Sequence, residues 1–149
     1  MEQNVSLFFH MNQMYRQYID QLNQLLSKYN LYSSQWAILY LLHYRGSNTL
    51  NEVAQMRNVE GPTITRLTNK LKDLGYVITV HGEDRRTKKI TVTDHGVEII
   101  KKIESEIAEF QNKITQGIPT EGMEMMNAYI ATIHDNLKKQ KGCHDWVQS

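Results

Sequence analysis

The sequence predicts a mainly α-helical protein with one small β-hairpin, and two observations carry this prediction. Through most of the chain, apolar residues recur every three or four positions, which is the period of a helix with one buried face. Residues 76–92 differ, because two short runs rich in β-branched residues flank a charged, polar turn there. With 40% hydrophobic and 22% charged residues among 149, the chain can bury a core.

Two helices are expected before residue 45. Residues 5–29 predict a long amphipathic helix, and residues 33–44 predict a second helix with Ser33 as its cap. The second helix contains the run 36–42, which is apolar nearly all round, so we expect it at the centre of the core. The apolar residues of the first helix recur at steps of three and four positions, namely Met11, Tyr15, Tyr18, Leu22, Leu25 and Tyr29.

The next two helices form a helix-turn-helix pattern. A capping box at 49–52 predicts a short third helix that ends at about Gln55. Residues 58–61 form a turn, and Pro62 lies in the first turn of a fourth helix, where its missing N–H costs nothing. Gly75 ends that helix. The predicted buried face of the fourth helix consists of Ile64, Leu67, Leu71 and Leu74.

A β-hairpin is expected directly after the fourth helix. Tyr76–His81 and Ile90–Val92 are the strands, and residues 82–87 are the turn between them. A hairpin in this position turns a helix-turn-helix into a winged helix-turn-helix lobe, with the hairpin as its wing. A wing directly after a helix-turn-helix is a far more specific sign of a DNA-binding lobe than either part alone.

Two more helices follow the wing. Thr93 is expected to cap a fifth helix with a coiled-coil-like apolar seam, and Thr120 a sixth, with a break at 117–119 between them. Residues 138–149 are polar and expected to be frayed. The first, fifth and sixth helices carry apolar stripes larger than one small lobe can cover, and exposed stripes of that size mark an interface. The sequence thus predicts a winged helix-turn-helix lobe plus helical dimerisation arms from both termini.

Positive charge gathers in the predicted lobe. Residues 57–93 carry a formal charge of +4, whereas the rest of the chain carries −3. The fourth helix leaves residue types that bond to base edges and phosphates on its outer faces, namely Thr63, Thr65, Arg66, Asn69 and Lys70. In the wing, Arg85 and Arg86 stand at a hairpin tip, followed by Lys88, where they can reach a minor groove and its phosphates. These side chains predict binding to double-stranded DNA.

The wing also resembles a known signature. Residues 84–96, DRRTKKITVTDHG, are similar to the wing of the multiple-antibiotic-resistance regulator (MarR) family, in which Asp, any residue and Arg precede an apolar-any-apolar-Thr strand end and a glycine. Residues 31–39 resemble the entry to that family's second helix, and residues 62–67 resemble its recognition helix. Tyr32 departs from the threonine or serine cap that is common in the family, and Ser33 is expected to substitute for it.

The resemblance implies a transcription regulator that acts as a homodimer on a pseudo-palindromic operator. The fourth helix would lie in the major groove and Arg86 in the minor groove, with Asp84 orienting Arg86. A two-fold dimer would read half-sites about one DNA turn apart. The resemblance favours a repressor released by a small phenolic or lipophilic effector. The implied segments are 1–30 (dimerisation helix), 31–95 (DNA-binding lobe), 96–141 (dimerisation helices) and 142–149 (flexible tail).

An effector crevice is expected to be lined by aromatic and polar residues of the first two helices, namely Tyr15, Arg16, Trp36, Tyr40 and His43. An aromatic stripe at helical spacing equally indicates buried core, so both interpretations stay open. No cofactor or metal is expected, because the histidines are scattered without ligand-like spacing. Cys143 lies in the tail and not in the first helix, where some relatives carry a reactive cysteine, so it indicates an incidental thiol.

Other functional classes fit the sequence less well. There is no glycine-rich phosphate loop and no nucleophile elbow, and residues 104, 106 and 109 are glutamates that indicate a solvated helix face, so an enzyme is not expected. The longest apolar run is too short to span a membrane, and a single cysteine fits a soluble, cytoplasmic protein. The alternative is a winged-helix protein-interaction module without specific DNA binding. Steep salt dependence would distinguish DNA binding from it.

Overall fold

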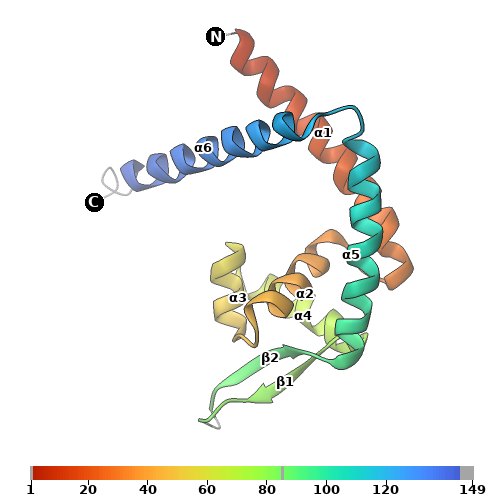
Figure 1. Ribbon diagram of the computed structural model, residues 1–149. Helices are drawn as coiled ribbons and strands as arrows, with labels where there is room; N and C mark the ends of the chain where they lie inside the picture. Colours follow the sequence, from red (N-terminus) through yellow and green to blue (C-terminus); the bar gives the residue numbers. More distant parts are fainter. Residues whose placement is uncertain (1, 85, 145–149) are drawn as a thin grey trace. The chain divides into compact units, whose positions relative to one another are not determined.

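The computed structural model describes the backbone of residues 2–84 and 86–144 and the side chains of residues 6–84 and 86–140 (Figure 1). The chain forms two compact units, Met1–Phe110 and Gln111–Ser149. The predicted mainly helical fold with one hairpin is confirmed. In chain order the elements are α1 (Glu2–Leu26), the 3-10 turn η1 (Ser27–Tyr29), α2 (Ser33–Arg45), α3 (Leu50–Arg57), α4 (Gly61–Asp73), β1 (Val77–His81), β2 (Lys88–Val92), α5 (Asp94–Ile114) and α6 (Thr120–His144).

The start of α2 shows that the expectation of a Ser33 cap is wrong. Tyr32 has the extended backbone of an N-cap, and its N–H donates to Oε1 of Gln35 at 2.7 Å. Ser33 is the first helical residue, and its N–H donates to Oδ1 of Asn23 at 2.8 Å. The amide side chains of Gln35 and Asn23 therefore cap the start of α2 in place of a hydroxyl. The Asn23 bond also connects α1 to the start of α2.

The helix-turn-helix forms largely as predicted. The Thr49 hydroxyl accepts the N–H of Glu52 at 3.2 Å, and the Glu52 carboxylate accepts the N–H of Thr49 at 2.7 Å, which completes the predicted capping box. The turn differs in one respect, because Gly61 is already the first residue of α4. Asn58 takes the left-handed conformation (φ 51°) that turns the chain, since asparagine tolerates that region.

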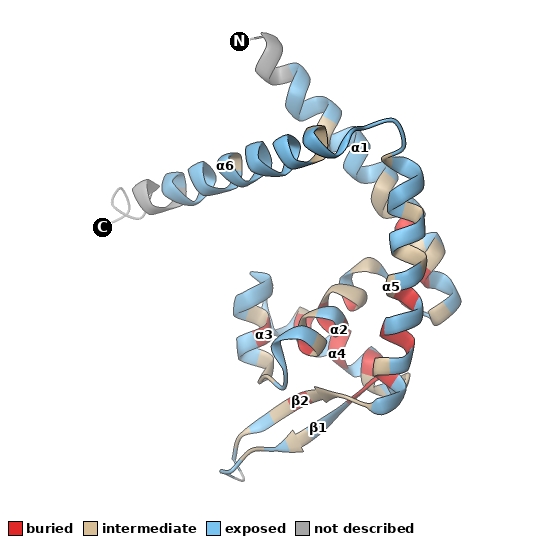
Figure 2. Ribbon diagram, viewed as in Figure 1, coloured by how far each residue is buried: buried red, intermediate tan, exposed pale blue. Residues whose placement is uncertain are grey.

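Three helices of the first unit supply most of its core, and Figure 2 shows buried residues concentrated in α2, α4 and the first half of α5. α2 contributes to the core as expected, but the expectation that the run 36–42 is buried nearly all round is wrong, because Tyr40 is 45% exposed. Of the predicted α4 face only Leu74 remains partly exposed. Thr68 joins that face, and its hydroxyl has no partner within the described residues. The fully or nearly buried side chains of these helices include Ile38, Leu39, Leu42, Ile64, Leu67, Leu71, Ile99, Ile100 and Ile103.

The wing is a two-stranded antiparallel sheet whose register pairs Val77 with Val92 and His81 with Lys88. The second strand therefore begins two residues earlier than predicted. One residue of the α2–α3 connection adds to the sheet, because Ile90 donates its N–H to the Asn48 carbonyl at 2.8 Å and accepts the N–H of Asn48 at 3.2 Å. The wing is thus attached to the residue that precedes the α3 cap.

The predicted Thr93 cap is confirmed and has a second function. Its hydroxyl accepts the N–H of Gly96 at 3.0 Å and donates to the carbonyl of Gly75 at 2.6 Å. Gly75 has φ +76° at the end of α4, and the N–H of Tyr76 returns to the Leu71 carbonyl, as in a helix terminated by glycine. One threonine therefore joins the end of α4 to the start of α5.

Two of the glutamates predicted to be solvated are hydrogen-bonded instead. Glu106 accepts the Tyr29 hydroxyl at 2.6 Å and lies 2.5 Å from the ammonium group of Lys28. The hydrogen bond to Glu106 raises the pKa of Tyr29 to about 12, and Lys28 and Tyr29 together lower the pKa of Glu106. Glu104 accepts the Tyr44 hydroxyl in the same way and raises the pKa of Tyr44 to about 12. α5 is thereby attached to both η1 and α2.

The second unit contains α6, whose start and end both differ from the predictions. Thr120 is the first helical residue, and the Pro119 carbonyl accepts the N–H of Met123 at 3.1 Å, so Thr120 is not the cap. The helix continues to His144, and most of the segment expected to be frayed is helical. Cys143 is part of this helix, but its side chain lies outside the described residues, as do residues 145–149.

Candidate nucleic-acid interface

The α4 residues predicted to bind DNA lie outside the core of the first unit. Four of them are exposed and Thr63 is half-buried, whereas Ile64, Leu67 and Leu71 of the same helix are buried. The exposed four are Thr65, Arg66, Asn69 and Lys70. Because the buried face holds the helix against α2 and α3, these side chains are presented to a ligand from a fixed support.

Thr65 has less freedom than the sequence suggests. Its hydroxyl donates to the carbonyl of Gly61, one turn earlier, at 3.0 Å. The hydroxyl proton is therefore used inside the helix, and the side chain can offer acceptor lone pairs and a methyl group instead of a donor. Among base edges, the methyl group suits a thymine.

At the wing tip, Asp84 positions the backbone of Arg86. The Asp84 carboxylate accepts the N–H of Arg86 at 3.1 Å, and the Asp84 carbonyl accepts the N–H of Thr87 at 2.9 Å. Gly82 closes the turn by donating its N–H to the Thr87 carbonyl at 2.8 Å. The side chain of Arg86 is exposed, as is that of Lys88, while Arg85 lies outside the described residues.

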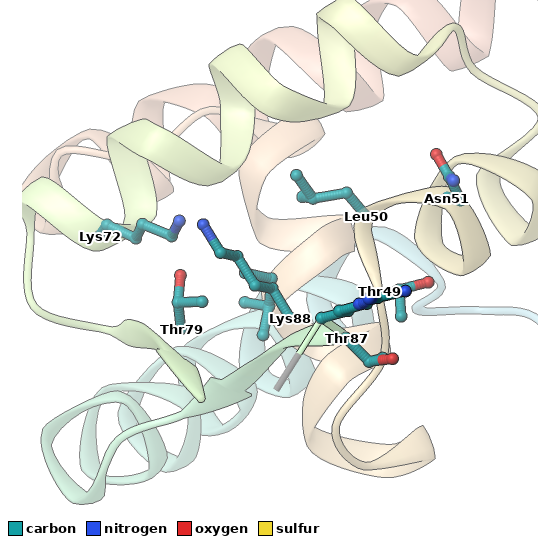
Figure 3. A pocket seen from close by; sticks show the side chains of 9 residues that line it. Thr49, Leu50, Asn51, Lys72, Thr79, Thr87 and Lys88 are labelled. Carbon is teal, nitrogen blue, oxygen red and sulfur yellow. The ribbon is translucent and has the colours of Figure 1, made fainter. Parts of the chain in front are cut away.

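A pocket of about 450 Å³ lies between the start of α3, the last turn of α4 and the wing (Figure 3). Two of its residues were predicted to bind DNA, Arg86 and Lys88. Lys72 was predicted only as one of the basic residues within 57–93, and no role was predicted for Thr79. Their place in the pocket depends on the strand register, which pairs Thr79 with Ile90, another lining residue. The pocket is lined by Thr49, Leu50, Asn51, Lys72, Thr79, Arg86, Thr87, Lys88 and Ile90.

Three of the predicted effector residues lie along α2. The rings of Trp36 and Tyr40 are 5.6 Å apart, the Tyr40 and Tyr44 rings 4.6 Å, and His43 meets the edge of Tyr44 at 4.8 Å. Tyr40 is 45% exposed, so this face of α2 is not core. Tyr15 and Arg16 are exposed on α1, and within the described residues no ring contact joins Tyr15 to the α2 aromatics.

The described residues offer neither a cluster of metal ligands nor a membrane-spanning helix. No three His, Cys, Asp or Glu side chains there are grouped so that they could hold a metal ion. None of the described helices is long and apolar enough to cross a membrane.

The sequence profile of the MarR family matches residues 29–87, which include the helix-turn-helix and the first strand and turn of the wing. An HTH-type transcriptional regulator of Bacillus subtilis (strain 168), YwoH, is 32% identical over 121 residues, which are 81% of this chain and 88% of YwoH. The chain belongs to the MarR family. As a MarR-family transcriptional regulator it is not an enzyme, and the predicted family and fold class are confirmed.

Solved MarR-family structures share the fold. Staphylococcus aureus MarR in complex with salicylate and kanamycin has a TM-score of 0.85 and 25% identity, over 93% of this chain and 94% of that one. S. aureus MepR in complex with DNA has a TM-score of 0.76 and 21% identity, over 87% of this chain and 96% of that one.

Proposed function

We propose that this MarR-family chain is a repressor that binds a pseudo-palindromic operator as a homodimer. The observation that carries the proposal is that α4 and the wing belong to one compact unit and both present exposed cations. Arg66 and Lys70 extend from the helix, and Arg86 and Lys88 from the wing. Helix side chains of these types read base edges in the major groove, and wing arginines suit the minor groove.

Exposed apolar side chains in both units support the homodimer. In the first unit, α1 exposes Leu7, Phe8 and Phe9, with Phe9 at 59%. In the second unit, Met126 and Ile130 lie one turn apart on α6 and are 43% and 49% exposed. Apolar side chains of this size are seldom left in water in such numbers, so a second copy of the chain is the partner that the proposal requires.

The α2 aromatics support a small phenolic or lipophilic effector. Trp36, Tyr40 and Tyr44 offer a continuous ring surface that is partly open, with His43 as a polar neighbour. S. aureus MarR was solved with salicylate, a phenolic acid, and this similarity supports the same ligand class here. An effector would release the operator only if it binds the DNA-free arrangement more tightly than the DNA-bound one.

Selection from a randomised DNA library tests the proposed function. We expect the bound fraction to converge on an inverted repeat with half-sites about one DNA turn apart. Affinity for that sequence should fall steeply as salt rises, because phosphate contacts release counterions. Convergence on no sequence, with weak binding that ignores salt, would support the protein-interaction alternative and contradict DNA recognition.

Arg66→Ala should weaken operator binding about tenfold to a hundredfold for each half-site, as loss of one base contact of roughly 1–3 kcal/mol per protomer implies. It should also relax sequence preference at one base pair of each half-site. Repeating the selection with the variant measures both effects. Lys101→Ala, which removes a cation from an exposed position of α5, is the matched control and should leave preference unchanged. If Arg66→Ala kept the same base preference as the wild type, Arg66 would not take part in base readout.

A further inference from the structure

The pocket between α4 and the wing is positively charged. Lys72, Arg86 and Lys88 all line it, and none of the nine described lining residues is acidic. Three cations around one hollow repel each other unless an anion lies between them, so this arrangement is more favourable with an anionic ligand than without one.

The donors converge from different elements. Figure 3 shows the side chains of Lys72, from α4, and Lys88, from β2, pointing toward one another across the pocket. The Thr79 hydroxyl, from β1, lies beneath Lys72 and is turned toward the same gap. Two ammonium groups and a hydroxyl provide donors on several sides of one point, as a tetrahedral oxyanion requires.

The walls of the pocket are fixed by contacts already described. The Asn48–Ile90 bridge attaches the start of α3 to β2, and the strand register places Thr79 opposite Ile90. The Glu52 carboxylate accepts the N–H of Thr49 at the start of α3 and is not one of the lining residues.

We propose that this pocket binds a phosphoryl group through Lys72, Lys88 and Thr79. The group has two sources: a backbone phosphate of the bound operator, or the phosphate of a free ligand. With about 450 Å³, the pocket has room for the sugar or organic part that accompanies either one. A backbone phosphate as the ligand rests on the proposed DNA-binding function. Phosphate binding by the pocket itself does not depend on that function.

Titration of the DNA-free protein with inorganic phosphate tests the pocket independently of any operator. At matched ionic strength, phosphate should raise the unfolding temperature of the wild type more than chloride does. Lys72→Gln and Lys88→Gln should each remove most of that difference, and Thr79→Val should reduce it. Lys101→Gln, the matched control on α5, should respond like the wild type. Equal effects of phosphate and chloride on the wild type, or a full phosphate response in Lys72→Gln, would overturn the proposal.

Operator binding then separates the two sources. If the pocket holds a backbone phosphate, Lys72→Gln lowers the slope of log affinity against log salt by about one per protomer, and base preference stays intact. Phosphate should then also compete with the operator more strongly than chloride at equal ionic strength. If phosphate binds the free protein but neither effect appears, the pocket belongs to a free phosphorylated ligand.

Discussion

Gly96→Ala should lower the free energy of unfolding by about 2–4 kcal/mol, because there is no room for a side chain at this position. A Cβ on Gly96 would lie 2.2 Å from the carbonyl oxygen of Tyr76 and 2.7 Å from Cγ1 of Val92. The closest atom belongs to the Tyr76 backbone, which moves less readily than a flexible side chain. The start of α5 therefore has to shift away from Tyr76 and Val92. That Tyr76 carbonyl also accepts the N–H of Thr93 at 3.0 Å, so the shift weakens the junction that caps α5.

Urea denaturation followed by circular dichroism measures this effect. The gain in helix propensity from glycine to alanine, about 1 kcal/mol, acts in the opposite direction and is already included in the expected range. Gly61→Ala is the matched control, since it too lies in a helix and a Cβ there meets nothing within 4 Å. The control should keep or slightly raise stability. An equal free energy of unfolding for the two variants would contradict the prediction, because it would mean that the start of α5 can shift without losing stability.

The elements of this fold could be predicted because local signals agree with tertiary packing. The capping box at Thr49 and the threonine cap at Thr93 are both hydrogen bonds between residues three apart, so the sequence reveals them directly. The apolar face of α4 follows from periodicity alone, whereas the run 36–42 in α2 is apolar nearly all round and did not show that Tyr40 would be exposed. The α2 cap could not be predicted in this way, because Asn23 reaches Ser33 from another helix.

The parts of the candidate site that were missed depend on pairing between distant segments. Lys72 and Lys88 are sixteen positions apart in the sequence, and only the hairpin register and the Asn48–Ile90 bridge bring them to one pocket. The glutamates of α5 were misinterpreted for the same reason. A surface-like heptad position gives no sign that Tyr29 or Tyr44, some sixty residues or more away, donates a hydrogen bond to it.

Met126→Asp combined with Ile130→Asp should convert the proposed dimer to monomers and reduce operator affinity by more than about a hundredfold. The two side chains share one exposed apolar face of α6, and burying a carboxylate in an apolar interface costs several kcal/mol. A monomer reads one half-site and loses the roughly 10²–10⁴-fold gain that linked half-sites provide. Sedimentation measures the mass, and fluorescence anisotropy with the selected operator measures the affinity.

Ala128→Asp provides the control, because residue 128 is exposed on the opposite side of α6 and the change adds one of the two negative charges that the double variant adds. It should leave both mass and affinity unchanged. The winged lobe lies in the other compact unit, so residual binding of the double variant to a single half-site should keep its base preference. A double variant that stays dimeric would move the interface to the exposed face of α1 around Phe8 and Phe9. A dimer lost without any loss of operator affinity would mean that each lobe binds DNA alone, and the operator would then have no reason to be palindromic.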